Sequence, residues 1–395
     1  RHFNGIVANF AYQGRAEGYS QYHAVLRPWL WLLTRHADCR IFQEKKVDDI
    51  FRDVCNATHG FSDFRLSLSE QYRQRDYCVQ YRESDYAFLS RLLEEEGIFY
   101  YFEHTEDKHT LVLADANSAF KDVPGDKKVV FRAPGEARVG LEHISSWRVG
   151  HQVQTGACVL DDYDFTKPRV DLQGRAAKQR QYAHADFEAY DYPGLHWEAA
   201  DGEKLARIRL EELQTQHRNF AGIADNRGFG PGLAFELDEY PRASENGEYV
   251  LESVEIEVES AEIEHFRGEA ENRFDVSFTA FDRREPYRPP RVTPKPFVRG
   301  PQTAVVVGKS GEEIWTDKYG RVKLQFHWDR EGKSDEKSSC WVRVSQTWAG
   351  KNWGAMHIPR IGQEVIVDFL EGDPDRPLVT GRVYNDAQMP PYALP

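Results

Sequence analysis

The spacing of hydrophobic residues changes along the chain, and the first regular pattern is helical. Apolar side chains stand three and four residues apart at Val47, Ile50, Phe51, Val54 and Cys55. This spacing places all of them on one face and predicts an amphipathic helix. The first part of the chain therefore contains at least one helix that packs against a core.

Two further helices are predicted. Ser84 is suited to cap the first turn of the second helix, and Gly97 supplies the left-handed conformation that ends it. The residues of this helix expected to face inward are Phe88, Leu89, Leu92 and Leu93. A third, more polar helix is predicted over residues 197–217, with Leu205, Ile208 and Leu213 on its buried side.

Strict alternation predicts strands in the same part of the chain. Apolar residues alternate with acidic ones through Val254, Ile256 and Val258, and a second alternating segment contains Phe274, Val276, Phe278 and Ala280. Each segment has one apolar face, as a half-buried strand does. The glycine-rich segment 228–232 lacks the preceding strand and following helix of a phosphate-binding loop, so we expect a turn there.

A proline-rich segment separates two regions of different character. Residues 285–301 carry prolines at a density that opposes a helix and deprives a sheet of donors, so we expect an extended linker. The expected organisation is a first region at 1–284 with two or more subdomains, a barrel at 302–386, and a connecting segment at 387–395.

Beyond the linker the regular patterns are β. In residues 321–328 the apolar side chains share one face and the polar ones the other. Further strands are predicted at 340–345, 354–358, 363–369 and 379–384, separated by turns rich in Gly, Pro and Asp. Short strands at this spacing suit a small barrel of the oligonucleotide/oligosaccharide-binding (OB) type. The expected fold class of the whole chain is mainly β with inserted helices (α+β).

Length, charge and cysteine content limit which kinds of protein the chain can be. A chain of 395 residues exceeds the size at which one core stops growing, so more than one domain is expected. The formal charge of -13 opposes a general nucleic-acid role, because binding to phosphates needs clustered Lys and Arg. The five cysteines are widely spaced without a Cys-x-x-Cys pair, so we expect reduced, partly buried thiols. Residues 3–10 already resemble a strand, and we expect the chain to begin inside a larger protein.

Three motifs in the second region resemble a known family. They are TDKYGRVKLQFHWDREG (316–332), WVRVSQTWAG (341–350) and IPRIGQEVIVDFLEGDPDRPLVTGRVYN (358–385). In this order they resemble the barrel of the VgrG (Rhs element Vgr) proteins of type VI secretion systems, which is similar to the barrel of the contractile phage tail spike. RDYCVQYRESDYAFLSRLLEEEGIFYYFEH (75–104) and PGLAFEL (231–237) resemble the tail-hub-like region of the same family. The resemblance covers nearly the whole chain.

The resemblance implies a fold and a role. It implies a phage tail-hub-like β-barrel region with inserted helices, followed by an OB-fold-like barrel. The implied assembly is a homotrimer that caps a tube of hexameric rings, contacts baseplate proteins, a tip protein and effectors, and punctures a target membrane. The implied location is the bacterial cytoplasm before export by the secretion system. Residues 387–395 are then the start of a connection to a β-helical needle.

The sequence lacks the spacings that catalysis requires. It has no Gly-x-Ser-x-Gly elbow, no His-Glu-x-x-His helix, no Walker loop and no Cys-rich zinc pattern. We therefore predict no catalytic residue, no cofactor and no metal ligand, and we expect a structural protein that is not an enzyme. Two alternatives stay open: a VgrG that carries an enzymatic effector domain beyond these residues, and an oligonucleotide-binding barrel protein.

Four groups of residues have a composition that could form a site. His104 and His109 lie near acidic residues but not at helix-face spacing, which favours a solvated hairpin. The acidic run 94–96 favours a solvated helix end compensated by a nearby Arg or Lys, because consecutive acids point in different directions. The acids in 371–376 favour a turn over a calcium loop.

The fourth group is aromatic. It consists of Phe326, Trp328, Trp341, Trp348 and Trp353. Such a stripe suits base stacking, but residues 302–395 carry 12 Lys and Arg against 13 Asp and Glu, which offers no excess of positive charge. Packing in the core and between subunits is the better explanation.

Overall fold

The computed structural model of the chain describes residues 2–16, 18–133, 135, 142–259 and 273–394. It forms two compact units. Unit 1 contains Arg1–Pro28, Ser62–Gln71 and Leu93–Arg291. Unit 2 contains Trp29–Phe61, Tyr72–Leu92 and Val292–Pro395, so the chain passes between the units several times.

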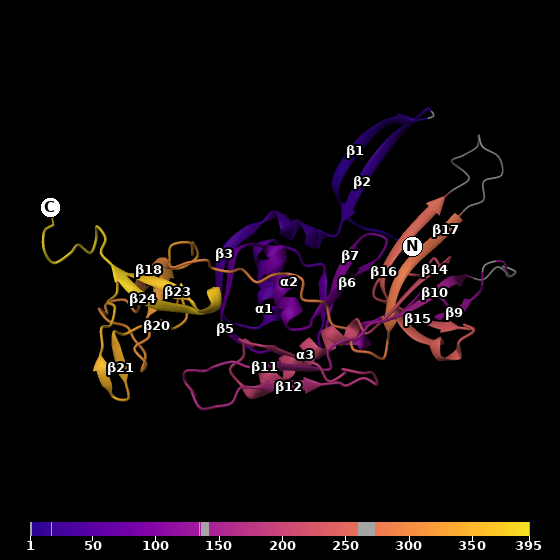
Figure 1. The fold of residues 1–395 in the computed structure, drawn as a ribbon. Coiled ribbons are helices and arrows are strands. Elements are labelled where there is room, and N and C mark those ends of the chain that lie inside the picture. Colours follow the sequence, from indigo (N-terminus) through magenta and orange to yellow (C-terminus); the bar gives the residue numbers. More distant parts are fainter. Residues whose placement is uncertain (1, 17, 134, 136–141, 260–272, 395) are drawn as a thin grey trace. The chain divides into compact units, whose positions relative to one another are not determined.

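The largest element of unit 1 is a seven-stranded sheet with the order β16-β17-β14-β10-β9-β15-β8 (Figure 1). Because β15 also pairs with β16, the sheet closes on itself. Its strands are β8 (Lys121–Asp122), β9 (Lys128–Phe131), β10 (His143–His151), β14 (Arg218–Ala224), β15 (Leu233–Asp238), β16 (Gly247–Glu259) and β17 (Arg273–Asp282). Closure removes open edges, which would otherwise pair with other chains.

Aromatic side chains fill the interior of this closed sheet. Trp147 is buried, and its ring centroid lies 5.3 Å from that of Phe220 and 4.8 Å from that of Tyr249. The alternation predicted for β17 is confirmed, and in β16 it holds except at Val258, which is 64% exposed. Ile256 of β16 packs against the core and pairs with Val276 of β17.

The glycine-rich segment 228–232 is a turn, as predicted, and it connects β14 to β15. Phe229 within it is fully buried and stacks near Phe235, with ring centroids 4.9 Å apart. Gly232 has a φ of +77°, and a Cβ there would lie 2.7 Å from the ring of Tyr101. The glycines therefore allow a sharp turn that places an aromatic side chain in the core.

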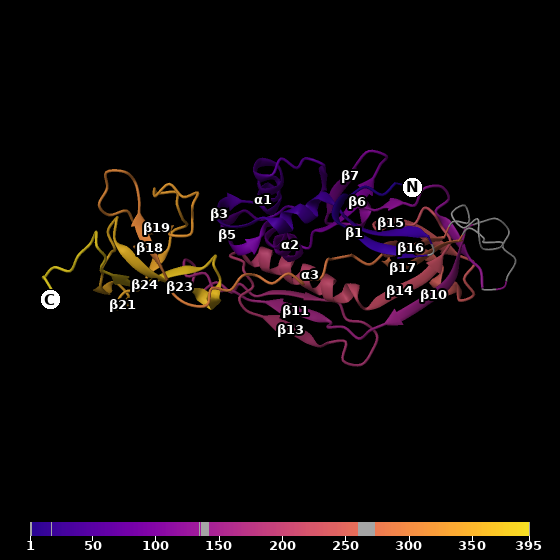
Figure 2. The same cartoon turned by 90° about the horizontal axis from the view of Figure 1, so that it is seen from above.

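Two smaller sheets complete the core of unit 1. Helix α3 (Ala199–Thr215) packs beside the sheet β12-β11-β13 (Figure 2). The strands of this sheet are β11 (Ala157–Leu160), β12 (Gly174–Ala177) and β13 (Glu188–Asp191), and those of the other are β4 (Phe64–Ser67), β6 (Phe99–His104) and β7 (His109–Ala114). The third predicted helix is confirmed, with Leu205 and Ile208 buried and Leu213 half-buried.

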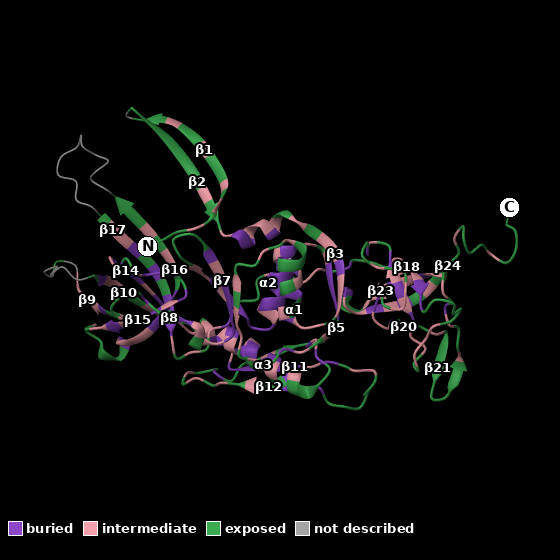
Figure 3. Cartoon of the chain, turned by 180° about the vertical axis from the view of Figure 1, so that it is seen from behind, coloured by how far each residue is buried: buried purple, intermediate pink, exposed green. Residues whose placement is uncertain are grey.

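The hairpin of β1 (Ile6–Ala16) and β2 (Tyr19–Arg27) is a two-stranded sheet whose described residues are all exposed or half-buried (Figure 3). On one face Phe10 and Tyr22 stack with ring centroids 5.5 Å apart, although they are 65% and 60% exposed. A two-stranded ribbon without a buried face has little stability of its own in water.

In unit 2, β3 (Ala37–Lys45) pairs with β5 (Arg75–Ser84) beside the helical segments. The 3-10 helix η1 covers Trp29–Arg35, α1 covers Val47–Arg52, the π-helix η2 covers Asp53–Thr58, and α2 covers Asp85–Glu95. The first predicted helix is confirmed with all its apolar positions buried, but its second half is wound as a π-helix. In α2 the predicted cap is also confirmed, since the Ser84 hydroxyl accepts the Ala87 N–H at 3.1 Å.

The second part of unit 2 is a five-stranded sheet with the order β19-β18-β23-β24-β20 around an apolar core. Its strands are β18 (Gln302–Val307), β19 (Lys323–Phe326), β20 (Arg343–Val344), β23 (Glu364–Phe369) and β24 (Pro377–Val383). The alternation did not identify β18, which lies between β19 and β23. The strand predicted at 354–358 is largely wrong, because β22 (Trp353–Ala355) pairs only with β21 (Trp348–Gly350) in a separate hairpin.

Residues 286–301 contain no described helix or strand, although Arg288 and Val298 within them are buried. The described helices include none that is long and apolar enough to span a bilayer.

The turn between β14 and β15 gives a test of the core of unit 1. Replacing Phe229→Ala removes a fully buried ring and leaves a cavity, so we expect the free energy of unfolding to fall by about 3–5 kcal/mol. The matched control is Phe187→Ala, because Phe187 is 61% exposed and its removal leaves no internal cavity. Denaturant unfolding of both variants measures the difference, and equal losses would contradict the assignment of Phe229 to the core.

Candidate functional site

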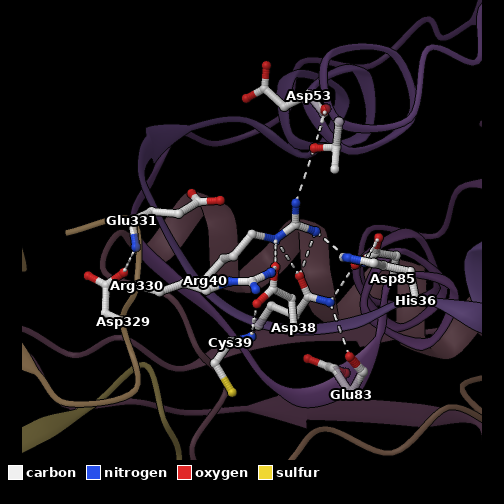
Figure 4. A network of polar contacts seen from close by, with 12 residues as sticks. His36, Asp38, Cys39, Arg40, Asp53, Glu83, Asp85, Asp329, Arg330 and Glu331 are labelled. Carbon is white, nitrogen blue, oxygen red and sulfur yellow. Dashed lines mark hydrogen bonds and ion pairs between the residues drawn. The ribbon is translucent and has the colours of Figure 1, made fainter.

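The most extensive buried polar network that we find in the described part of unit 2 is centred on Arg40 and Asp85 (Figure 4). Arg40 lies in β3 directly opposite Gln80 of β5. Its Nε and Nη2 donate to Gln80 Oε1 at 2.9 and 2.8 Å, and Nη2 also donates to Asp85 Oδ1 at 2.8 Å. Nη1 reaches Thr58 Oγ1 at the end of η2. One guanidinium therefore connects a sheet and two helices.

The carboxylate of Asp85 is fully buried and is surrounded by donors. Oδ1 accepts from Arg40 and from Gln80 Nε2, the latter at 2.7 Å. Oδ2 lies 2.8 Å from His36 Nδ1 and 2.5 Å from His59 Nε2. Burial alone would raise the pKa of Asp85, but the hydrogen bonds from His59 and Gln80 and the charge of Arg40 lower it below its usual value. Asp85 is therefore a carboxylate anion at neutral pH.

The two histidines reach Asp85 from different segments. His36 precedes β3, and its carbonyl accepts the Asp85 N–H at 3.0 Å. His59 directly follows the π-helix η2. Their rings meet edge to face with centroids 5.0 Å apart, and their side chains are 39% and 20% exposed. Sequence analysis missed this cluster, because no fixed spacing connects the three residues and only folding brings them together.

A second buried ion pair holds α2 against β5. Arg91 Nη2 lies 2.8 Å from Glu83 Oε1 and also donates to the Val79 carbonyl at 2.8 Å. Burial raises the pKa of Glu83 in spite of the opposing effect of Arg91. Removing either partner would leave a buried charge without compensation.

The turn at 371–376 lies between β23 and β24 of the barrel and contacts β5. Asp375 Oδ1 accepts the Val79 N–H at 2.6 Å, while Lys295 Nζ lies 2.7 Å from Asp373 and 2.6 Å from Asp375. Burial and the neighbouring Asp375 raise the pKa of Asp373. The predicted turn is confirmed, and Glu371 and Gly372 adopt positive φ. Asp373 and Asp375 of this turn both bind Lys295, and Asp375 also accepts the backbone N–H of Val79.

Further polar contacts join the same two parts of unit 2. Gln302 donates to the Tyr81 hydroxyl at 2.8 Å and accepts from Trp328 Nε1 at 2.9 Å. At the rim, Arg330 Nη2 lies 2.6 Å from Asp38 Oδ2. The two-stranded sheet β3–β5 and the barrel are therefore connected by directional bonds from residues of both parts.

The other candidate groups do not form a common site. His104 and His109 face each other across the hairpin β6–β7, as predicted, but His109 is buried and burial lowers its pKa. The prediction of a solvated helix end at 94–96 is wrong, because Glu96 is buried and the two preceding acids are half-buried. Glu96 lies in the turn that follows α2, and the sequence pattern did not indicate its burial.

The predicted aromatic stripe divides into a core part and an exposed part. Phe326 is buried in the barrel, and Trp328 stacks on it with centroids 5.0 Å apart. Trp348 and Trp353 are 64% and 57% exposed on the separate hairpin. Among the cysteines, burial raises the pKa of Cys78 and Cys340 to about 12, which keeps both thiols protonated.

Two family matches cover most of the chain. Residues 1–262 match the phage tail baseplate hub (GPD) family, and residues 303–384 match the type VI secretion system/phage-baseplate injector OB domain. The second match coincides with the five-stranded sheet of unit 2. The expected fold class, a hub-like β region with inserted helices followed by an OB-type barrel, is confirmed.

Proteins with a similar sequence are named as spike proteins of the type VI secretion system. The chain is 50% identical over 396 residues to the Pseudomonas aeruginosa protein named type VI secretion system spike protein VgrG1b, covering 100% of the chain and 53% of that protein. It is 50% identical over 395 residues to VgrG1c of the same organism, covering 100% and 54%. The chain thus spans about half the length of these relatives.

Solved structures share the fold. The E. coli c3393 protein, described as a component of the type VI secretion system with structural similarity to phage T4 tail proteins gp27 and gp5, superposes with a TM-score of 0.67 at 20% identity. That match covers 97% of the chain and 84% of the solved chain. The Francisella PdpA-VgrG complex matches with a TM-score of 0.59 at 11% identity, covering 98% and 66%. The hub and barrel matches, together with the similarity of all residues of this chain to VgrG proteins, show its family. The chain belongs to the phage tail baseplate hub family and, within it, to the VgrG spike proteins.

Proposed function

We propose that this chain forms the hub and barrel of a trimeric, cell-puncturing spike of a type VI secretion system. The observation that carries the proposal is the 50% identity over the whole chain to proteins named as spikes of that system. In this role the protein caps the secreted tube, contacts the baseplate and helps to deliver effectors. It is made in the bacterial cytoplasm and leaves the cell through the same machine.

The exposed hairpin β1–β2 supports self-association. Its aromatic face contains Phe10, Tyr12 and Tyr22, each more than half exposed. Exposed apolar side chains grouped in this way favour a protein partner, and a ribbon with no buried side gains stability when one covers it. Copies of the same chain are the partner that a trimeric hub supplies.

The work proposed for this chain is mechanical and requires no catalytic residue and no cofactor. Rigid attachment of the barrel suits that work, and the contacts of Asp375, Gln302 and Arg330 provide it within unit 2. The domain limits proposed from the sequence remain 1–284, 285–301, 302–386 and 387–395. An enzymatic effector domain beyond these residues is compatible with the spike role and would add a second activity.

The attachment of the barrel gives one test. Asp375→Ala removes the acceptor of the buried Val79 N–H and one partner of Lys295, so we expect a loss of about 1–3 kcal/mol in the free energy of unfolding. It should also increase the rate at which trypsin separates the barrel from the rest of the chain.

The control for this test is Asp386→Ala, since Asp386 is exposed. That variant should unfold and digest like the parent chain. If Asp375→Ala behaves in the same way, the contact at Val79 does not stabilise the attachment.

The trimer gives the second test. We expect the complete gene product to sediment as a trimer, and the double variant Phe10→Asp/Tyr22→Asp to shift it toward the monomer, because charges on both rings oppose burial. The control is His23→Asp, whose side chain lies on the opposite face of the same hairpin because it pairs with Ala11. Sedimentation velocity measures the masses. A stable monomer at high concentration would overturn the proposed assembly, and an intact trimer in the double variant would exclude this face from it.

A further inference from the structure

Three metal-ligating side chains converge in unit 2 from separate segments of the chain, and Figure 4 shows two of them, His36 and Asp85. His36 lies between η1 and β3, His59 follows η2, and Asp85 is the first residue of α2. One possible ligand atom from each residue lies within 4.8 Å of the other two. We propose that His36, His59 and Asp85 bind a divalent transition-metal ion, for which zinc(II) is the best match.

The donor set suits zinc. Two imidazole nitrogens and one carboxylate oxygen are ligands that zinc accepts, and a site with three protein ligands leaves a fourth position for water. Ligand atoms around tetrahedral zinc stand about 3.3 Å apart when the bonds are about 2.0–2.1 Å. The carboxylate Oδ2 lies 2.8 and 2.5 Å from the two nitrogens, so each nitrogen needs to move away from Oδ2 by less than about 1 Å to reach this spacing. The two nitrogens already lie within 4.8 Å of each other.

The surroundings of Asp85 leave one oxygen for the ion. Arg40 and Gln80 both donate to Oδ1, whereas both imidazoles face Oδ2. Ligand carboxylates in metal sites are characteristically held by such outer hydrogen bonds, which fix their orientation. The bond from the Asp85 N–H to the His36 carbonyl also fixes the two backbones relative to each other.

The site is accessible from one side. Asp85 is fully buried, whereas the side chains of His59 and His36 are 20% and 39% exposed, so the histidines provide the route from solvent. The π-helix η2 ends directly before His59 and sets the direction from which that residue approaches. Such wide turns occur frequently at functional sites. An ion bound here would cross-link η2, the start of β3 and the start of α2.

The competing explanation is a network without an ion, in which both imidazoles donate N–H to Asp85 Oδ2. The two explanations differ in what happens when metal is added. Zinc binding displaces those protons and should give a saturable signal, whereas the hydrogen-bonded network should give none.

The experiment titrates the metal-free chain with zinc chloride by calorimetry in a buffer that does not bind zinc. We expect one zinc ion per chain, and at least about a tenfold loss of affinity in both His36→Gln and His59→Gln. Cobalt(II) titration supplies a second readout, because its visible absorption reports coordination by nitrogen and oxygen and should change in the same variants. Circular dichroism checks that each variant is folded, and the greater exposure of His36 makes His36→Gln the milder change.

The matched control is His104→Gln, which alters a separate histidine pair, His104 and His109, that lies in unit 1. That variant should bind zinc like the parent. The proposal is overturned if the parent chain binds no zinc, if both ligand variants bind it unchanged, or if His104→Gln alone abolishes binding.

Discussion

Burial of the Asp85 carboxylate requires the surrounding segments to supply its hydrogen bonds, because an uncompensated charge in the protein interior is very unfavourable. Arg40 from β3 and Gln80 from β5 satisfy one oxygen, and the histidines before β3 and after η2 approach the other. The position of α2 against the two-stranded sheet β3–β5 depends on this arrangement. The same constraint makes the cluster attractive to a cation.

The core of unit 1 is stabilised by a different kind of interaction. Its closed sheet packs around Trp147 and neighbouring aromatic rings, which are large, apolar and arranged edge to face or stacked. Hydrophobic burial stabilises this core strongly, but it is non-directional and does not fix how the strands are oriented. In this unit, direction comes from strand pairing, since closure through β15 and β16 fixes the register of the sheet.

Much of the fold could be predicted from the sequence because the periodic signals are local. The helices at Val47, Ser84 and Leu205 and the strands at Ile256 and Val276 carry their own spacing, so no knowledge of their neighbours was needed. Strand β18 was missed, because its short apolar run lacks clear alternation with charged residues.

The candidate site could not be predicted in the same way. His36, His59 and Asp85 belong to different elements, and their convergence depends on the pairing of β3 with β5 and on the π turn of η2. Periodicity contains no information about either. The prediction for Glu96 was wrong for a related reason, because a run of acidic residues does not indicate which of them is buried.

The attachment of the barrel follows from the open edge of a two-stranded sheet. Among the described strands β5 pairs only with β3, so the backbone groups on its other edge need acceptors and donors. At Val79 a barrel aspartate, Asp375, accepts the N–H, and Arg91 donates to the carbonyl. Directional bonds of this kind fix the register between surfaces that apolar contacts alone would allow to slide. For the mechanical role proposed for this chain, such fixed contacts within unit 2 matter more than a larger core.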